Sequence, residues 1–191
     1  DEVEQWLRGF AASRFDQAIL INNAGVIPTV GPADGCNSAE LSGALRVGLE
    51  STILLTAGFL RATRSWQADR RVLNISSGLG RRAMAGSAVY CAVKAAMDHF
   101  SRAVALDESH RTGNSGGSAA RIVSLAPGVI DTDMQLQLRT ADSAGFPAQD
   151  YFRQQHAEGL LASAADSATR IVAYLTRPDF GEEPVADIRT V

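Results

Sequence analysis

Short apolar runs alternate along the chain with longer stretches of amphipathic character. Four runs have the length and apolar content of buried strands: residues 18–21, 72–75, 121–125 and 184–188. Longer stretches with apolar side chains at helical spacing lie before and between them: residues 1–7, 39–63, 88–106 and 166–175. Strands that alternate with helices form parallel sheets with right-handed crossovers, so the pattern predicts an α/β fold.

The helix expected at residues 88–106 carries a candidate proton-transfer pair. Tyr90 and Lys94 lie one turn apart on a shared face. A free tyrosine has a pKa of about 10, and a neighbouring ammonium group favours the phenolate and lowers that pKa. Ser77 follows the strand at 72–75, so its hydroxyl is expected at the carboxyl edge of the sheet, where open α/β sheets bind ligands.

A tyrosine and a lysine at this spacing also occur by chance on helix surfaces, so the pair gains meaning from its neighbours. Asn-Asn-Ala-Gly at 22–25 follows one strand, Asn-Ile-Ser-Ser at 74–77 ends another, and Pro-Gly-Val-Ile-Asp-Thr at 127–132 follows a third. Taken singly, 22–25 and 127–128 are compatible with ordinary turns. Together and in this order, the signals resemble those of the short-chain dehydrogenase/reductase family.

The resemblance implies a Rossmann-type doubly wound parallel sheet in three α/β/α layers, with residues 1–191 forming one dinucleotide-binding and catalytic domain. It implies an NAD(P)H-dependent oxidoreductase that reduces a small ketone or diketone. In this scheme Tyr90 donates a proton to the carbonyl oxygen, Ser77 holds that oxygen, and Lys94 binds the nicotinamide ribose. The implied cofactor contacts are Asn22, Ala24 and Gly25 on the adenosine side, then Tyr90 and Lys94, and Pro127, Gly128, Ile130 and Thr132 over the nicotinamide.

Within the family, the segments around Tyr90 and after Pro127 look most like those of sepiapterin reductases and bacterial benzil or carbonyl reductases. NADP(H) is the cofactor expected from this likeness, with NAD(H) also open. Residues 139–161 correspond to the substrate lid. Asp187 resembles an acid that holds the pterin in sepiapterin reductases, so Ser77, Tyr90 and Asp187 are the expected substrate contacts. A purely structural role for Asp187 is an open alternative.

Two features depart from the family pattern. Gly48 stands where the family usually has an asparagine that organises a water-linked proton relay, so a water, Glu50 or Ser51 replaces the amide, or turnover is impaired. No glycine-rich turn follows a strand, and the glycines within 111–118 precede one, which predicts a flexible surface loop there. The sequence therefore resembles the carboxyl-terminal two thirds of such an enzyme.

A chain without the preceding strands has physical consequences. We expect the strand at 18–21 to form an exposed apolar edge that promotes aggregation. Expressed alone, residues 1–191 are expected to bind NADPH weakly, because a glycine-rich turn at a helix amino terminus is the main partner of the pyrophosphate.

Composition narrows the possible classes. The net charge is −3 and no basic stripe with interleaved aromatic residues occurs, which argues against a nucleic-acid partner. No apolar run reaches membrane-spanning length, so we expect no membrane association. His99, His110 and His156 lie apart from one another, so we expect no metal site. Cys36 and Cys91 give no disulfide framework, which fits a cytoplasmic location. The family resemblance implies a homodimer or homotetramer. A non-catalytic dinucleotide-binding or interaction protein of the same fold is the alternative.

Overall fold

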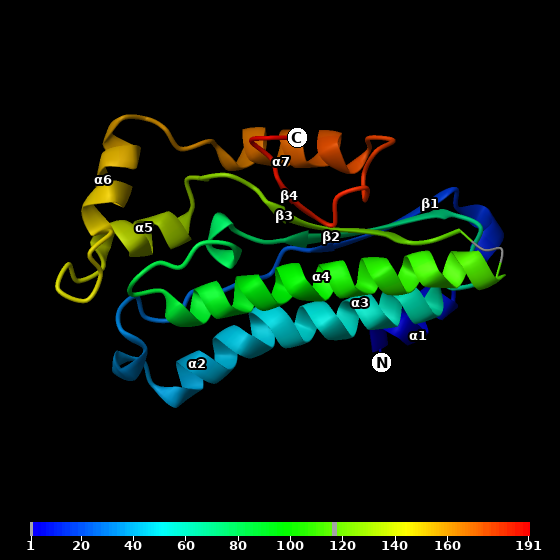
Figure 1. Ribbon diagram of the computed structural model, residues 1–191, viewed down its shortest axis with the longest axis horizontal. Helices are drawn as coiled ribbons and strands as arrows, with labels where there is room; N and C mark the ends of the chain where they lie inside the picture. The colour runs from blue at the N-terminus through cyan, green and yellow to red at the C-terminus, as the bar shows by residue number, and fades with distance from the viewer. Residues whose placement is uncertain (1, 116–117) are drawn as a thin grey trace.

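The computed structural model describes residues 2–115 and 118–191, and a four-stranded parallel sheet lies at its centre (Figure 1). The strands are adjacent in chain order: β1 (Gln17–Asn22), β2 (Asp69–Ile75), β3 (Arg121–Ala126) and β4 (Val185–Asp187). All three pairings are parallel, so the four strand carboxyl ends meet at one edge. The four strands expected from the apolar runs are therefore confirmed.

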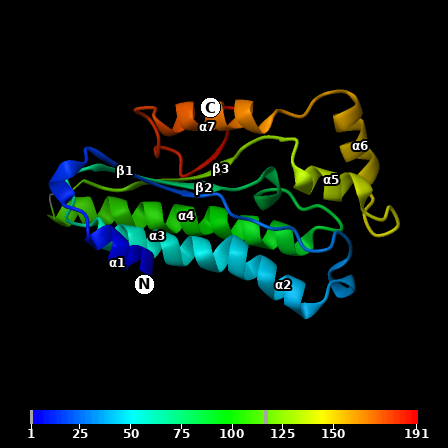
Figure 2. The same cartoon turned by 180° about the vertical axis from the view of Figure 1, so that it is seen from behind.

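Helices cover both faces of this sheet. Those on one face are α1 (Glu2–Arg8), α2 (Ser38–Leu45), α3 (Ser51–Ala62) and α4 (Ala88–Ser115). The opposite face carries α7 (Ala164–Leu175), while α5 (Asp133–Thr140) and α6 (Gln149–Ala157) lie beyond the end of the sheet (Figures 1 and 2). Short 3-10 turns occur at Ala12–Arg14 (η1), Ala33–Gly35 (η2) and Gly78–Gly80 (η4). The expected three-layer α/β/α arrangement is confirmed.

Each face of the sheet has its own hydrophobic core. Leu73, Val123 and Leu125 pack with Tyr174, Leu175 and Phe180 on the α7 side. Phe59, Leu60, Val72 and Ile122 pack together on the α3 side. Strands buried on both faces read as nearly continuous apolar runs, which is why the sequence pattern located them.

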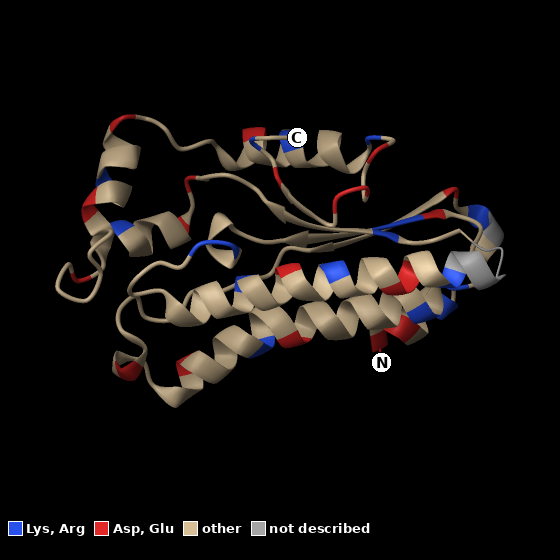
Figure 3. Cartoon of the chain, viewed as in Figure 1, with Lys and Arg blue, Asp and Glu red and all other residues tan. Residues whose placement is uncertain are grey.

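The helix expected at 39–63 is one long helical segment with a π-helical stretch, η3 (Arg46–Glu50), between α2 and α3. It contains only four charged residues, Glu40, Arg46, Glu50 and Arg61 (Figure 3). By length and by a mean hydropathy of 1.3, the segment Ser38–Ala62 meets the criterion for a helix that could cross a membrane. Core helices meet the same criterion, and this helix packs on the sheet through Phe59 and Leu60.

The structure corrects one boundary. Helix α4 continues to Ser115, so residues 111–115 of the expected loop are helical, and residues 116–117 lie outside the described part of the chain. Local composition favoured a loop here, whereas the helix continues from a long packed segment.

The expected apolar edge is present. β1 is the outermost strand, and Ile19 and Ile21 are 39% and 45% exposed. Ala18 and Leu20 pack toward the α3 side, so Ile19 and Ile21 point to the opposite face of the sheet, while one row of β1 backbone N–H and C=O groups lies at the open edge.

The residues corresponding to the lid form a packed unit. Leu138, Phe146 and Phe152 bury their side chains together, with Ile27 and Met84 packed against them. The unit thus rests on the loops that follow β1 and β2, at the carboxyl edge of the sheet.

Candidate functional site

Tyr90 and Lys94 lie on the face of α4 that meets the end of β2. The Lys94 side chain is buried, and its Nζ donates a hydrogen bond to the carbonyl oxygen of Ile75 at 2.7 Å. The same Nζ lies 5.6 Å from the centre of the Tyr90 ring. The helix therefore brings the phenol and the ammonium together at the strand end, as the spacing predicted.

Ser77 joins this pair from the turn after β2. Its Oγ accepts a hydrogen bond from the N–H of Leu79 at 3.2 Å and caps η4. Because the oxygen is used as an acceptor, the hydroxyl proton can be donated to another oxygen. Ser77 also interacts with the Tyr90 phenol and lowers its pKa. The three residues expected to act together are thus neighbours.

The pKa of Tyr90 differs in direction from the sequence expectation. Burial raises it, and Ser77, not Lys94, is the group that lowers it. Lys94 turns its ammonium toward the Ile75 carbonyl. A raised pKa keeps the phenol protonated at neutral pH, which suits a proton donor.

Burial acts more strongly on Lys94. It lowers the pKa of the ammonium from its ordinary 10.5 to about 8, and the Asp98 carboxylate opposes that change. A buried lysine whose pKa lies near neutrality responds to small changes in its surroundings.

The turn after β1 reaches the same place. A Cβ built on Gly25 would lie 3.6 Å from Lys94 Nζ, so the glycine leaves the space beside the ammonium open. The Asn22 side chain points into the fold, where its Nδ2 donates to Thr56 Oγ1 at 3.1 Å and to Asn74 Oδ1 at 2.8 Å. Asn22 therefore has only backbone groups to offer a ligand, and the neighbouring Ala24 is exposed.

The segment 127–132 leaves β3 at the same edge. Gly128 has a φ of +85°, a backbone conformation that favours glycine. A bridge to Ala162 uses the Val129 carbonyl and the Asp131 N–H, so the N–H and C=O of Ile130 point to the other side. Thr132 begins α5 without capping it through its side chain. Within the described residues, no hydrogen bond engages the Ile130 backbone groups or the Thr132 hydroxyl, so their contact with a ligand stays a prediction, while Pro127 starts the turn.

Asp187 is already engaged by the protein. Both carboxylate oxygens accept hydrogen bonds from the Arg189 guanidinium, at 2.8 and 2.6 Å, and this arginine lowers the pKa of Asp187. Arg189 was not expected from the sequence, yet its Nη2 lies 4.0 Å from a Cβ built on Gly78, next to Ser77. The structure therefore places a cation, paired with Asp187, beside the Ser77 turn.

Gly48 fits its surroundings only because it has no side chain. A Cβ there would lie 2.6 Å from Val93 Cγ1. Neither suggested substitute is available, because the Ser51 hydroxyl donates to Val47 O at 2.6 Å and Glu50 is exposed on the outer face of the helix. Neither Glu50 nor Ser51 therefore takes the place of the asparagine.

Asp98 is a further site residue that the sequence analysis missed. It follows Lys94 by one helical turn, so Tyr90, Lys94 and Asp98 form a stack on one face of α4. This i, i+4, i+8 spacing was the signal that could have revealed it. Its carboxylate is buried.

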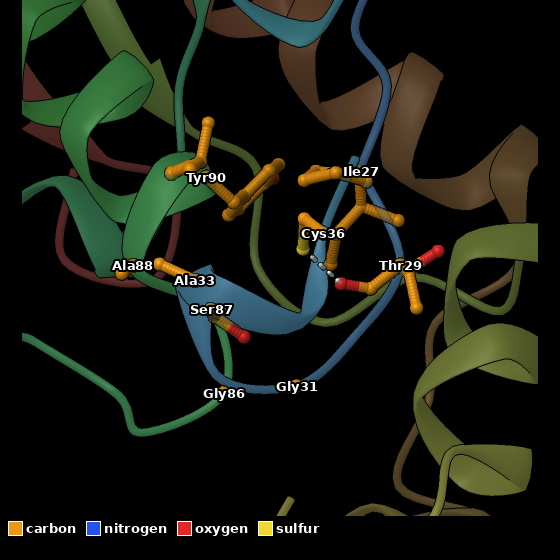
Figure 4. A pocket seen from close by; sticks show the side chains of 11 residues that line it. Ile27, Thr29, Gly31, Ala33, Cys36, Gly86, Ser87, Ala88 and Tyr90 are labelled. Atoms are coloured by element: carbon orange, nitrogen blue, oxygen red, sulfur yellow. Dashed lines mark hydrogen bonds between the residues drawn. The ribbon is translucent and has the colours of Figure 1, made fainter. Parts of the chain in front are cut away.

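A small cavity adjoins Tyr90 on the side of the β1 loop (Figure 4). Cys36, Thr29 and Ser87 contribute its polar atoms, and Cys36 Sγ donates to the Thr29 carbonyl at 3.2 Å. Residues 27–36 therefore close the site next to the start of α4.

Known proteins are similar to this chain in sequence and in fold. A family model for short chain dehydrogenases matches residues 2–143. A benzil reductase ((S)-benzoin forming) from Bacillus cereus is 34% identical over 169 residues, covering 88% of this chain and 66% of that protein. The sepiapterin reductase of Rattus norvegicus is 32% identical over 170 residues, covering 87% of this chain and 61% of that protein.

The crystal structure of a short chain dehydrogenase from Burkholderia cenocepacia J2315 in complex with NADP matches with a TM-score of 0.67 at 22% identity. The match covers 96% of this chain and 68% of that one. The chain thus spans about two thirds of the length of these proteins.

Proposed function

The chain belongs to the short chain dehydrogenase family, and from this premise we propose that the protein reduces the carbonyl group of a small molecule, with Tyr90 as proton donor. The observation that carries the proposal is the meeting of Ser77, Tyr90 and Lys94 at the carboxyl edge of the sheet. Each has the state its role needs: a protonated phenol, a hydroxyl with a free proton, and a buried ammonium.

The residues present fit the nicotinamide half of a dinucleotide cofactor. Gly25 leaves room beside the Lys94 ammonium, and Ile130 and Thr132 offer free backbone and hydroxyl groups on the facing segment. Asn22, Ala24, Pro127 and Gly128 would line the same space. When bound, a reduced nicotinamide supplies hydride to the carbonyl carbon.

The protein groups handle the proton and the developing charge. Ser77 donates a hydrogen bond to the carbonyl oxygen, which becomes negative as the bond is reduced. Tyr90 transfers its phenolic proton to that oxygen. The Lys94 ammonium would bind the ribose hydroxyls of the bound cofactor.

For the substrate we propose a small ketone or diketone, with NADP(H) as the cofactor and NAD(H) as the other possibility. The names of the benzil and sepiapterin reductases support a carbonyl between or beside aromatic groups. The NADP in the Burkholderia cenocepacia structure supports the cofactor. Asp187 belongs to this proposal as a substrate contact that acts together with Arg189. We also propose that the protein has a single domain and forms a cytoplasmic homodimer or homotetramer.

The test is Tyr90→Phe in the full-length protein. Reduction of a diketone such as benzil should fall by about 10²-fold or more, because only the proton donor is lost. NADPH affinity should stay within a few-fold of wild type by calorimetry. Tyr174→Phe removes a hydroxyl from the α7 core and serves as the matched control, which should keep full turnover. Equal turnover in the Tyr90 variant and wild type would refute the assignment.

A second candidate, a dinucleotide-binding protein without catalysis, is favoured by one observation. Val93 fills the space in which a side chain at Gly48 would organise the relay behind Lys94. This candidate predicts NADPH binding with no NADPH oxidation in a panel of diketones and pterins. Any oxidation that depends on Tyr90 excludes it.

A further inference from the structure

Asp98 is a fully buried carboxylate directly behind the proposed catalytic residues. It is 1% exposed, and its Oδ1 accepts hydrogen bonds from Ser76 Oγ at 2.6 Å and from Ser124 Oγ at 2.7 Å. Ser76 immediately precedes Ser77, and Ser124 lies in β3, which leads into the 127–132 segment. One oxygen therefore ties two parts of the site to α4.

The other oxygen is not satisfied in the same way. Asp98 Oδ2 has no hydrogen-bond partner among the described residues, and the cation that approaches it is Arg81, whose Nε lies 4.0 Å away. The backbone of Gly80 covers it so closely that a Cβ there would lie 2.9 Å from this oxygen. The turn η4 thus seals the carboxylate in a place where solvent cannot stabilise its charge.

A neutral amide would accept the two serine hydrogen bonds equally well. Burying a charge is costly unless an opposite charge compensates it, so the acid needs a reason beyond these bonds. Lys94 provides that reason, because it lies one turn earlier on the same face, is 4% exposed, and donates its hydrogen bond to a neutral carbonyl.

We propose that Asp98 is a positioning residue of the carbonyl-reducing site, whose negative charge keeps the buried Lys94 protonated while its hydrogen bonds hold Ser76 and Ser124 in place. The proposal deepens the proposed function and rests on it for its catalytic meaning. The charge relation between Asp98 and Lys94 can be measured without any substrate.

The charged and titratable groups around this pair set the direction of the effect. Tyr90 and Asp98 lie on α4 itself, and Arg81 approaches Asp98 from the end of η4. Asp187 of β4 stands behind Arg81, with 4.0 Å between Arg81 Nη2 and Asp187 Oδ2. The hydrogen-bond partners of the pair are neutral: Ile75 of β2, Ser76 directly after it, and Ser124 of β3. Asp98 is therefore the negative charge that acts on Lys94 most directly.

The experiment compares Asp98→Asn with wild type in the full-length protein labelled with [6-13C]lysine. Lys94 is the sole lysine of residues 1–191, and its resonance is assigned as the one that disappears in Lys94→Met. Removing the carboxylate should shift the titration midpoint of this resonance to lower pH by roughly one pH unit. The alkaline limb of kcat/KM for diketone reduction should move with it.

Glu108→Gln is the matched control. Glu108 is the other buried carboxylate of α4, pairs with Arg64 and Arg70, and lies about 15 Å further along the helix axis. Its variant should be less stable yet leave the Lys94 midpoint unchanged. An unchanged midpoint in a folded Asp98→Asn protein overturns the proposal. If Asp98→Asn shifts the Lys94 midpoint but the wild-type protein reduces no carbonyl, only the proposed function is overturned.

A variant that does not fold also gives an answer. If Asp98→Asn unfolds because Lys94 is left without its counter-charge, then Lys94→Met in the same chain should restore folding. Thermal unfolding followed by circular dichroism measures this. Failure of the double variant to regain stability over Asp98→Asn refutes charge compensation.

Discussion

Lys94 combines two properties that rarely occur together, a buried position and a charge. Burial lowers its pKa to about 8, whereas in the unfolded chain it titrates near 10.5. Between these values the unfolded chain binds one more proton than the folded protein at this residue. The contribution of Lys94 to the free energy of unfolding therefore rises with pH across that window and is constant outside it.

The measurement is the free energy of unfolding of wild type minus that of Lys94→Met, from urea titrations at several pH values. We expect the difference to increase between about pH 8 and 10.5, by at most about 1.4 kcal/mol per pH unit. Lys94→Met cannot lose a proton, so it removes the window. A difference that does not vary with pH would mean that the lysine is not protonated differently in the two states.

The pKa values of Tyr90 and Lys94 also set which of the two residues is charged at neutral pH. Burial raises the pKa of the phenol and lowers that of the ammonium. At neutral pH the tyrosine holds its proton and the lysine is still largely charged, which is the combination that reduction of a carbonyl requires. A more alkaline medium removes the charge from Lys94 first.

At the scale of elements, the contact between η3 and α4 sets how closely the two long helices approach. Gly48 in η3 faces Val93, the residue before Lys94. The π-helical turn and the missing side chain bring the η3 backbone next to α4. The close packing beside Lys94 therefore depends on Gly48 and Val93 together.

A double-mutant cycle tests this pair. Gly48→Ala should destabilise the protein by about 1–3 kcal/mol, despite the better helix propensity of alanine, because its Cβ overlaps Val93 Cγ1. Val93→Ala removes the overlapping methyl, so the double variant should lose less stability than the sum of the two single variants. Urea denaturation supplies the four values. Strict additivity would show that the two residues do not compete for the same space.

At the scale of the whole molecule, the helical layer leaves an apolar surface facing away from the sheet. Leu45, Leu49, Ile53 and Leu54 line a shallow groove there, and Leu54 is 62% exposed. Small residues allow two helices to approach closely, and four lie on α3 and α4: Ala95 and Ala103 are exposed, Ala57 is half-buried, and Gly58 is buried beside Glu4 of α1. Leucines, more than Gly58, therefore form the surface through which we expect the chain to assemble.

Light scattering at micromolar concentration tests the assembly. Wild-type full-length protein should have at least the mass of a dimer, and Leu54→Glu should reduce that mass, because a dimer would bury its carboxylate in an apolar interface. Leu160→Glu places the same charge at another exposed leucine, beyond α6, and should leave the mass unchanged. A monomeric wild type contradicts the proposal.

The sequence by itself determined the four strands and the main helices between them, but not α5, α6 or the π-helical turn η3. Continuous apolar runs located the four strands because both sheet faces are buried, and helical spacing placed Tyr90 and Lys94 on one face. Parallel strands end at one edge, so the positions of Ser77, Gly25 and Thr132 near that edge also followed from the order of the elements. These features depend on residues close together in the chain, where periodicity and turn chemistry act.

Only the tertiary structure decided the relations between distant residues. The Arg189 ion pair with Asp187, the Val93 methyl against Gly48 and the serine hydrogen bonds of Asp98 each join segments far apart in sequence. The direction of the Tyr90 pKa belongs here too, since it depends on how much protein surrounds the phenol. Periodicity assigns a residue to a face, whereas burial, counter-charges and free space arise only when the faces pack together.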